Sequence, residues 1–165
     1  MHFVNNLHNY LEVKASKFGY GLFSLQDIAT GVPVCAVEGK YISFKETLLL
    51  GDKESHALQV AIDKYILCEP PFLYSNHSCE PNCGLDANLE LVTLKPIIKG
   101  EEIFWDYSTS MLERHWTMPC NCGTNSCRKI ITDFDLLPLS LQEHYIKLKV
   151  VLPFITNELL YKIAI

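Results

Sequence analysis

The sequence predicts a mostly-β domain that ends in a short helical segment. Short β-rich runs fill the first two thirds of the chain, turn residues separate them, and helical patterns gather near the end. Strands do not alternate regularly with long helices, which excludes a doubly wound nucleotide-binding fold. At 165 residues, 48% of them hydrophobic, the chain suits one domain with a sizeable core.

The strands are predicted from β-branched and aromatic runs that glycine or polar residues bound. Two pairs of these runs flank short polar turns, at Asp63-Lys64 and at Asp86-Ala87-Asn88, and are hairpin candidates. The expected strands are Tyr10–Lys14, Gly21–Ser24, Pro33–Val37, Leu58–Ile62, Tyr65–Leu67, Cys83–Leu85, Leu89–Thr93 and Glu102–Phe104.

Helical signals are fewer. Phe44–Leu50 is expected to form a short helix, because Gly51 follows it as a stop signal. Ser140 and Glu143 have the spacing of a capping box, which predicts a helix from there to about residue 150. A last helix is expected over residues 156–163.

The bulk charge limits the partners. A formal net charge of -5 argues against a general nucleic-acid binder and fits a basic protein partner. The first residues lack a basic segment followed by an apolar run, and no apolar stretch approaches the roughly 20 residues of a membrane span. We therefore expect a soluble intracellular protein, cytoplasmic or nuclear, or an effector acting in a host cell, with no membrane and no direct nucleic-acid contact.

A thiol cluster predicts a metal site. The seven cysteines are an odd number, and without a secretory signal clustered thiols point to metal rather than to disulfides. Cys120, Cys122 and Cys127 lie on one short segment, and soft ligands so close together suit a structural zinc, which takes four. The fourth ligand must come from elsewhere: the leading candidate is Cys79, and the rivals are His115 and Cys83. Cys35 and Cys68 lie in apolar strands and are expected to be buried, inert thiols.

Four segments that carry chemistry follow one another in a definite order. They are Gly19-Tyr20-Gly21, then Asn76-His77-Ser78-Cys79-Glu80-Pro81-Asn82, then Gly100-Glu-Glu-Ile-Phe-Trp105-Asp106-Tyr107, then the Cys120, Cys122 and Cys127 cluster. This succession resembles the SET-domain protein lysine methyltransferases with a post-SET zinc-binding loop. The resemblance spans about residues 10 to 130, and its Asn-His-Ser-Cys-x-Pro-Asn signature is highly specific.

The resemblance implies a fold of small curved β-sheets around a pseudoknot-like crossing, in which the Asn-His segment passes beside the Asp-Tyr segment. It also implies a division of the chain into a SET catalytic domain at 1–115, a post-SET zinc loop at 116–130 and a helical C-terminal extension at 131–165. The implied activity is methyl transfer from S-adenosylmethionine to a lysine of a basic protein, histones being one candidate.

The same resemblance assigns roles to residues. Phe18, Gly19 and Tyr20 would line the methionine end of the methyl donor through backbone groups, and Asn76 and His77 would hold its amino group and adenine. Tyr107 would be the catalytic tyrosine, and Trp105 would occupy the aromatic position that influences how many methyl groups are added. The implied zinc ligands, for one structural zinc, are Cys79, Cys120, Cys122 and Cys127.

The chain departs from the family pattern at four positions. Leu73 replaces the usual arginine, His56 replaces an aromatic residue that meets the donor, Trp105 replaces phenylalanine or tyrosine, and Lys129 replaces a glycine. Leu73 and His56 motivate an alternative hypothesis, a catalytically silent SET-like module that binds a basic peptide. Trp105 lacks the hydroxyl that restrains the substrate amine, which favours di- or trimethylation.

Overall fold

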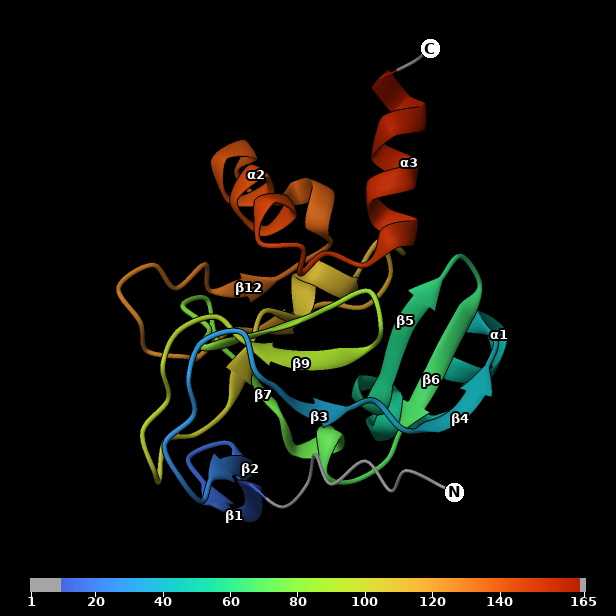
Figure 1. The fold of residues 1–165 in the computed structure, drawn as a ribbon. Coiled ribbons are helices and arrows are strands. Elements are labelled where there is room, and N and C mark those ends of the chain that lie inside the picture. The colour runs from blue at the N-terminus through green and yellow to red at the C-terminus, as the bar shows by residue number, and fades with distance from the viewer. Residues whose placement is uncertain (1–9, 164–165) are drawn as a thin grey trace, which may run out of the picture.

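The computed structural model describes residues 10–163, whose strands form small sheets of two or three strands each (Figure 1). The mostly-β prediction is confirmed. The strands are β1 (Leu11–Ser16), β2 (Gly19–Ser24), β3 (Pro33–Ala36), β4 (Gly39–Ile42), β5 (Ala57–Ala61), β6 (Lys64–Cys68), β7 (Asn76–His77), β8 (Cys83–Leu85), β9 (Glu90–Thr93), β10 (Phe104–Trp105), β11 (Met118–Pro119) and β12 (Ile130–Ile131).

Most of the pairing is antiparallel and local. The β1–β2 hairpin forms a ribbon at one end of the molecule, and the two three-stranded sheets have the orders β4-β6-β5 and β3-β9-β8. Both predicted hairpin turns are confirmed, between β5 and β6 and between β8 and β9. The strand predicted at Glu102–Phe104 is shifted, because Glu102 forms only an isolated bridge with Phe23 and β10 begins two residues later.

One parallel pair joins distant segments. In β7 and β10, Asn76 lies opposite Phe104 and His77 lies opposite Trp105. The Asn82 side chain fastens this crossing, since its amide accepts from the Phe104 backbone N–H at 2.8 Å and donates to the Glu102 carbonyl at 2.7 Å. The Asn-His segment therefore runs directly beside the segment that leads into Asp106 and Tyr107.

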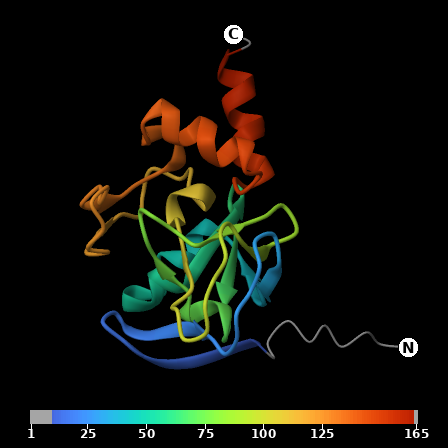
Figure 2. The same ribbon diagram turned by 60° about the vertical axis from the view of Figure 1, so that its left-hand side comes forward.

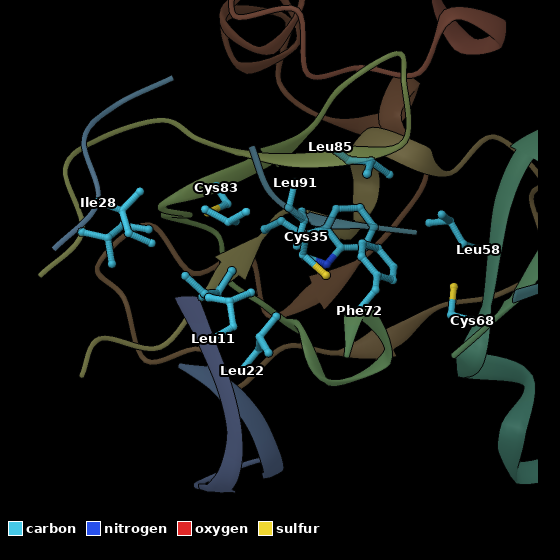
Figure 3. Packing of buried hydrophobic residues seen from close by; sticks show 14 of the residues in the cluster. Leu11, Leu22, Ile28, Cys35, Leu58, Cys68, Phe72, Cys83, Leu85 and Leu91 are labelled. Atoms are coloured by element: carbon cyan, nitrogen blue, oxygen red, sulfur yellow. The ribbon is translucent and has the colours of Figure 1, made fainter. Parts of the chain in front are cut away.

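The main hydrophobic cluster lies where these sheets converge (Figure 3). Leu11 and Leu22 reach it from the β1–β2 ribbon, and Leu58 and Cys68 reach it from β5 and β6. The centre is filled from β3, β8 and β9 by Cys35, Cys83, Leu85 and Leu91. Cys35 and Cys68 are buried as expected, and burial raises the pKa of each thiol to about 12.

The helices are short. They are α1 (Phe44–Thr47), α2 (Leu139–Lys147), α3 (Pro153–Ile163) and the 3-10 turns η2 (Gly51–His56), η3 (Phe72–Tyr74), η4 (Tyr107–Ser110) and η5 (Phe134–Leu136). Within residues 10–163, none of them is both long and apolar enough to cross a bilayer.

The capping box predicted at Ser140 is wrong. Helix α2 begins one residue earlier, at Leu139, so Ser140 is already helical and cannot act as the extended residue that caps a helix. A capping box does occur at α1, where the Ser43 side chain accepts from the Glu46 backbone and the Glu46 carboxylate accepts from Ser43. Helix α1 is also shorter than predicted, ending at Thr47.

The helical segment has its own core. Helices α2 and α3 lie at the end of the molecule opposite the β1–β2 ribbon in both views (Figures 1 and 2). Phe134, Tyr145, Val150 and Ile155 form a second buried cluster there. Helix α3 begins at Pro153, earlier than predicted, because the fixed φ of proline suits the first turn of a helix.

Candidate active site and metal centre

Tyr107 is held at three points beside the β7–β10 pair. Its hydroxyl donates to the Ser75 carbonyl at 2.8 Å, and its backbone N–H donates to His77 Nδ1 at 3.2 Å. The rings of His77 and Tyr107 lie in an edge contact with centroids 5.3 Å apart. Burial raises the pKa of the Tyr107 phenol, so this hydroxyl stays protonated and available as a donor at neutral pH.

An aromatic and acidic cavity opens next to Tyr107. Its volume is about 70 Å³, and its walls combine rings with carboxylates. Among the residues that line it are Tyr65, Trp105, Tyr107 and Trp116, with Glu54 and Glu113. His56 and Leu73, two of the positions at which the sequence departs from the family pattern, line the same cavity.

Trp105 forms part of the cavity wall with its polar group already bound. Its indole N–H donates to the Ser75 hydroxyl at 3.0 Å, and its ring contacts Tyr107 with centroids 4.8 Å apart. The residue is only 4% exposed. A single serine, through its carbonyl and its hydroxyl, therefore fixes both aromatic side chains.

Glu113 is the partly buried acid of the cavity. Its carboxylate accepts a short hydrogen bond from the Tyr65 hydroxyl and a second bond from the Trp116 backbone N–H at 3.4 Å. Burial raises the pKa of Glu113, and the nearby Asp133 adds to this, whereas the bond from Tyr65 opposes it. A carboxylate among aromatic rings provides favourable surroundings for a cationic side chain.

On the other face of the crossing, Asn76 contacts Gly19-Tyr20-Gly21 at the start of β2, a segment that we call the glycine turn. The Asn76 amide donates to the Tyr20 carbonyl at 2.9 Å and to Glu102 Oε1 at 2.8 Å. The Ser16 hydroxyl holds both Glu102 oxygens, at 2.9 and 3.0 Å. A Cβ at Gly21 would lie 2.3 Å from Glu102 Oε1, so only glycine lets the carboxylate approach this strand.

The acceptors on this face suit a cation. The Tyr20 carbonyl, the Asn76 side chain and the Glu102 carboxylate converge there, and an ammonium group, which only donates hydrogen bonds, needs such acceptors. Phe18 and Tyr20 flank the turn and remain 37% and 62% exposed. Their rings make edge contacts with Phe104 and Tyr74, respectively. The predicted donor residues Phe18, Gly19, Tyr20 and Asn76 are thus brought together.

Asp106 is the most heavily bonded side chain near the site. Its buried carboxylate accepts two bonds from the Arg128 guanidinium, at 2.7 and 2.8 Å, and one from the Tyr145 hydroxyl at 2.9 Å. His77 Nδ1 lies 3.6 Å away. Burial lowers the pKa of His77 to about 4, against the opposing effect of Asp106, so its imidazole is neutral at pH 7.

Four thiols gather beside His77. The sulfur atoms of Cys79, Cys120, Cys122 and Cys127 all lie within 4.8 Å of one another. Sγ of Cys120 is 3.7 Å from that of Cys79 and 3.6 Å from that of Cys127. Sulfur ligands about 2.3 Å from a tetrahedral zinc are about 3.8 Å apart, so the cluster fits this ion.

Burial raises the pKa of the Cys79 and Cys120 thiols, whereas the pKa of Cys122 is lowered. Although burial opposes it, the hydroxyl and backbone of Thr124 and the backbone of Cys79 help lower the pKa of the Cys122 thiol to about 6. A metal ligand must be a thiolate, and this one is formed readily. His77 Nε2 lies 3.5 Å from the Cys79 sulfur, which connects the thiol cluster directly to the tyrosine site.

The thiol loop touches both neighbouring segments. Strands β11 and β12 close it at its base, where the Cys120 N–H donates to the Lys129 carbonyl at 2.7 Å. Ser126 bonds Glu80 through its backbone and its hydroxyl. The Lys17 ammonium donates to the Cys122 carbonyl at 2.8 Å, which ties the loop to the glycine turn.

The two rival ligands lie elsewhere. Cys83 is fully buried in β8, and burial raises its pKa to about 12. The His115 ring lies 2.8 Å from a Glu54 oxygen and against the Phe44 ring, outside the group of thiols.

Comparison with known proteins agrees with this geometry. Residues 19–108 match the SET domain family, and they include the glycine turn, the Asn-His segment and Tyr107. The chain belongs to the SET domain family.

The chain is similar to parts of longer proteins and to part of a solved structure. It is 28% identical over 160 residues to the mouse histone-lysine N-methyltransferase SETMAR, covering 74% of this chain and 52% of that protein. It is 28% identical over 131 residues to the Drosophila melanogaster histone-lysine N-methyltransferase ash1, covering 68% of this chain and 6% of that protein. The chain therefore spans about half or less of the length of these relatives.

Its fold matches a chain in a humanized mutant of the Chaetomium thermophilum Polycomb Repressive Complex 2 bound to the inhibitor GSK126. The TM-score is 0.55 at 21% identity, over 62% of this chain and 15% of that chain. This likeness identifies the fold.

Sequence reasoning missed several residues of this SET domain. Glu102 lies inside the segment from Gly100 to Tyr107 and Arg128 directly follows Cys127, but neither was assigned a role from the sequence. No sequence motif marks Glu113, because only folding brings it to Tyr65 and into the cavity beside Tyr107. Tyr145 lies within the helix predicted from Ser140 onward, and nothing in the sequence indicates that its hydroxyl reaches the buried Asp106.

Proposed function

We propose that this SET domain is a protein-lysine N-methyltransferase that uses S-adenosylmethionine. The observation that carries the proposal is the Tyr107 phenol. It lies between His77, beside the donor-facing turn, and an aromatic cavity whose lining includes acidic side chains. This position supports a role for a single hydroxyl at the point where a methyl donor and a lysine would meet.

The donor would be held on the Asn76 face. The Tyr20 carbonyl, the Asn76 side chain and Glu102 would bind its ammonium, and the backbone of Phe18 and Gly19 would line its methionine end. Asn76 and His77 would also contact the adenine. When bound, S-adenosylmethionine supplies an electrophilic methyl group on a positively charged sulfur. The protein would favour the neutral lysine amine and align it with this methyl group.

The cavity would favour the neutral, reactive form of the lysine side chain. A lysine with a pKa of about 10.4 is protonated at pH 7, and its neutral form costs roughly 4 to 5 kcal/mol. Trp105, Tyr107 and Trp116 would reduce that cost by excluding water from the ammonium. The Ser75 carbonyl and the Tyr107 hydroxyl would then align the neutral amine, so that catalysis rests on positioning and on fixed dipoles.

Zinc would have a structural role. Cys79, Cys120, Cys122 and Cys127 would hold one ion with no ligand position left open for chemistry. Binding would fix the thiol loop against the Asn-His segment and, through Lys17, against the glycine turn. The energy of metal binding would thus stabilise the donor-binding face.

Trp105 would allow di- or trimethylation. Its N–H is engaged by the Ser75 hydroxyl, so it has no free polar group to restrain an amine that already carries a methyl. The substrate would be a basic protein, given the net charge of -5 and the acidic side chains of the cavity. Histones are the first candidates because curated relatives are named histone-lysine methyltransferases, and a histone substrate would place the protein in the nucleus.

Methyl transfer from labelled S-adenosylmethionine to core histones and to a cell lysate tests the proposal. Wild type should label lysines, and mass spectrometry of the product should find dimethyl or trimethyl lysine. Tyr107→Phe keeps the ring but loses the hydroxyl, so the rate should fall by about 100-fold. Its melting temperature and its affinity for S-adenosylhomocysteine should stay close to those of wild type.

Tyr41→Phe is the matched control, because Tyr41 is 55% exposed and lies outside the residues that line the Tyr107 cavity. Its rate should equal that of wild type. Full activity of Tyr107→Phe would remove the proposed role of this tyrosine. Binding of a basic peptide by wild type without transfer to any lysine would instead support a catalytically silent module.

A further inference from the structure

Through the side chain of Tyr145, the helical C-terminal segment contacts Asp106, which caps the turn that begins at Tyr107. We call this turn, η4, the catalytic turn. This residue lies on α2, is 2% exposed, and donates its hydroxyl to Asp106 Oδ2 at 2.9 Å. Asp106 directly precedes Tyr107 and is itself 2% exposed. In Figure 2 the short yellow turn η4, which begins at Tyr107, lies directly below the orange α2.

The Asp106 carboxylate is shared among three segments. From the thiol loop, Arg128 donates to both oxygens, at 2.7 and 2.8 Å. From η4, the Ser108 backbone N–H donates to Oδ1 at 3.1 Å, and from α2 the Tyr145 hydroxyl completes the set on Oδ2. A buried carboxylate is stable only when such bonds compensate its charge, so each donor helps to fix its position.

Two backbone bonds support the same contact. The Leu152 N–H donates to the Thr109 carbonyl at 3.2 Å, and the Phe134 N–H donates to the Met111 carbonyl at 2.9 Å. The C-terminal segment thus binds the C-terminal end of η4 through its backbone. Among the described residues of the C-terminal segment from 131 to 163, only the Tyr145 side chain donates a hydrogen bond to the Asp106 carboxylate, which lies next to Tyr107.

We propose that Tyr145 is a positioning residue for methyl transfer, whose hydroxyl fixes the Asp106 carboxylate and thereby the backbone of Tyr107. The inference rests on the proposed function of this SET domain. The Tyr107 N–H must meet His77 Nδ1 at 3.2 Å while its hydroxyl meets the Ser75 carbonyl at 2.8 Å. A rotation of the preceding residue would disturb both contacts at once.

A purely structural role of Tyr145 predicts a different outcome. Its ring belongs to the second hydrophobic cluster, with Phe134, Val150 and Ile155. Phenylalanine at this position would keep that packing and remove only the hydroxyl. The substitution therefore separates support of the helical segment from control of the catalytic turn.

The test compares full-length wild type, Tyr145→Phe and the control Tyr161→Phe, each loaded with zinc. Tyr161 lies on α3 and is 71% exposed, so its variant should behave as wild type. Tyr145→Phe should lower kcat about tenfold and change KM for the donor and for the peptide less than twofold. Its bound zinc should remain that of wild type. An unchanged kcat would overturn the proposal, as would a loss of kcat explained by lost zinc or by a smaller folded fraction.

A double mutant connects the effect to Asp106. With Asp106→Asn in place, adding Tyr145→Phe should change kcat less than twofold, because both substitutions act on one contact. Independent, multiplying effects would contradict the mechanism. Should Tyr145→Phe fold poorly, Arg128→Lys provides a second variant, because it weakens the hydrogen bonds that the thiol loop makes to the same Asp106 carboxylate. It should lower kcat by a similar factor with KM retained, and an unchanged kcat would overturn the proposal.

A readout without turnover separates this inference from the proposed function. In a Trp116→Phe background, the fluorescence of Trp105 reports on the catalytic turn, because its ring contacts Tyr107 with centroids 4.8 Å apart. Tyr145→Phe should change that emission and Tyr161→Phe should not. If wild type transfers no methyl group, the proposed function fails, and the emission still decides whether Tyr145 positions the turn. Identical emission from both variants would overturn the positioning role.

Discussion

The two faces of the candidate site are built differently. On the side proposed to face the lysine, Trp105 is only 4% exposed, and ring contacts and a hydrogen bond to Ser75 hold it before any ligand arrives. On the side proposed to face the donor, Phe18 and Tyr20 are 37% and 62% exposed, and the groups offered are the Tyr20 carbonyl, the Asn76 side chain and the Glu102 carboxylate.

This difference indicates a division of labour. Packing preorganises the face where geometry decides the rate. The donor face depends on contacts from outside, in particular on the bond between Lys17 and the thiol loop. Perturbing the loop should therefore affect donor binding first, whereas changes in the cavity should leave donor binding intact.

The largest effect on this comparison is expected from Cys122→Ser. Bound zinc should fall well below one per chain, the melting temperature should drop by about 5 to 10 °C, and affinity for S-adenosylhomocysteine should weaken about tenfold or more. Peptide affinity should change less, because neither Lys17 nor Cys122 lines the cavity. Atomic absorption, thermal melts and calorimetry make the measurements.

Cys35→Ala controls for the loss of a thiol, since Cys35 is buried in β3 outside the cluster. It should keep its zinc. Unchanged zinc content in Cys122→Ser would contradict the ligand assignment, and a loss confined to peptide binding would reverse the comparison of the two faces.

A smaller effect is expected from Glu102→Gln on the donor face. Removing this charge from beside Asn76 should weaken S-adenosylhomocysteine binding about fivefold, the scale of about 1 kcal/mol for a partly exposed ion pair. Titration calorimetry measures the affinity, and peptide KM should stay constant. Glu101→Gln is the control, because the Glu101 carboxylate instead accepts the Ile98 backbone N–H at 2.8 Å. Equal affinities for all three proteins would remove Glu102 from the donor site.

The smallest effect is expected from Glu113→Gln in the cavity. Burial raises the pKa of this carboxyl above its ordinary value of 4.5. Such a group stabilises the fold while protonated, below its unfolded pKa, and loses that contribution as pH rises through its folded pKa. The glutamine side chain stays neutral at every pH, so the variant should melt about 2 °C above wild type at pH 8.

Thermal melts at pH 8 and pH 4 test the sign of this effect. At pH 4 the difference should shrink, because the wild-type carboxyl is then protonated as well. A variant less stable than wild type at pH 8 would mean that the ionised Glu113 is favourable where it lies. Donor affinity should not change in either case.

Local pattern was sufficient for much of the fold. The hairpins around Asp63 and Asp86 were predictable because their turns and flanking runs lie side by side in the sequence. Strands β7 and β10 were not, because each has two residues and exists only through its distant partner. Ser140 was misread as a cap because it matches the motif, although the chain there enters the helix earlier, after Pro138.

The site was predictable to the extent that its residues stand in ordered motifs. Asn76, His77, Tyr107 and the clustered cysteines were found in this way, and the structure brings them together. Tyr145 and Glu113 were not found, since a tyrosine in a helix and a glutamate in a loop look ordinary until the chain folds. Their importance depends on partners 39 and 48 residues away, which a local pattern cannot contain.

The separation of Cys79 from its three companion thiols has a consequence for synthesis on the ribosome. A chain that has emerged only as far as Tyr107 possesses one sulfur of the four and lacks the Arg128 and Tyr145 contacts of Asp106. Nascent and prematurely terminated chains would therefore lack three of the four thiols of the proposed zinc site.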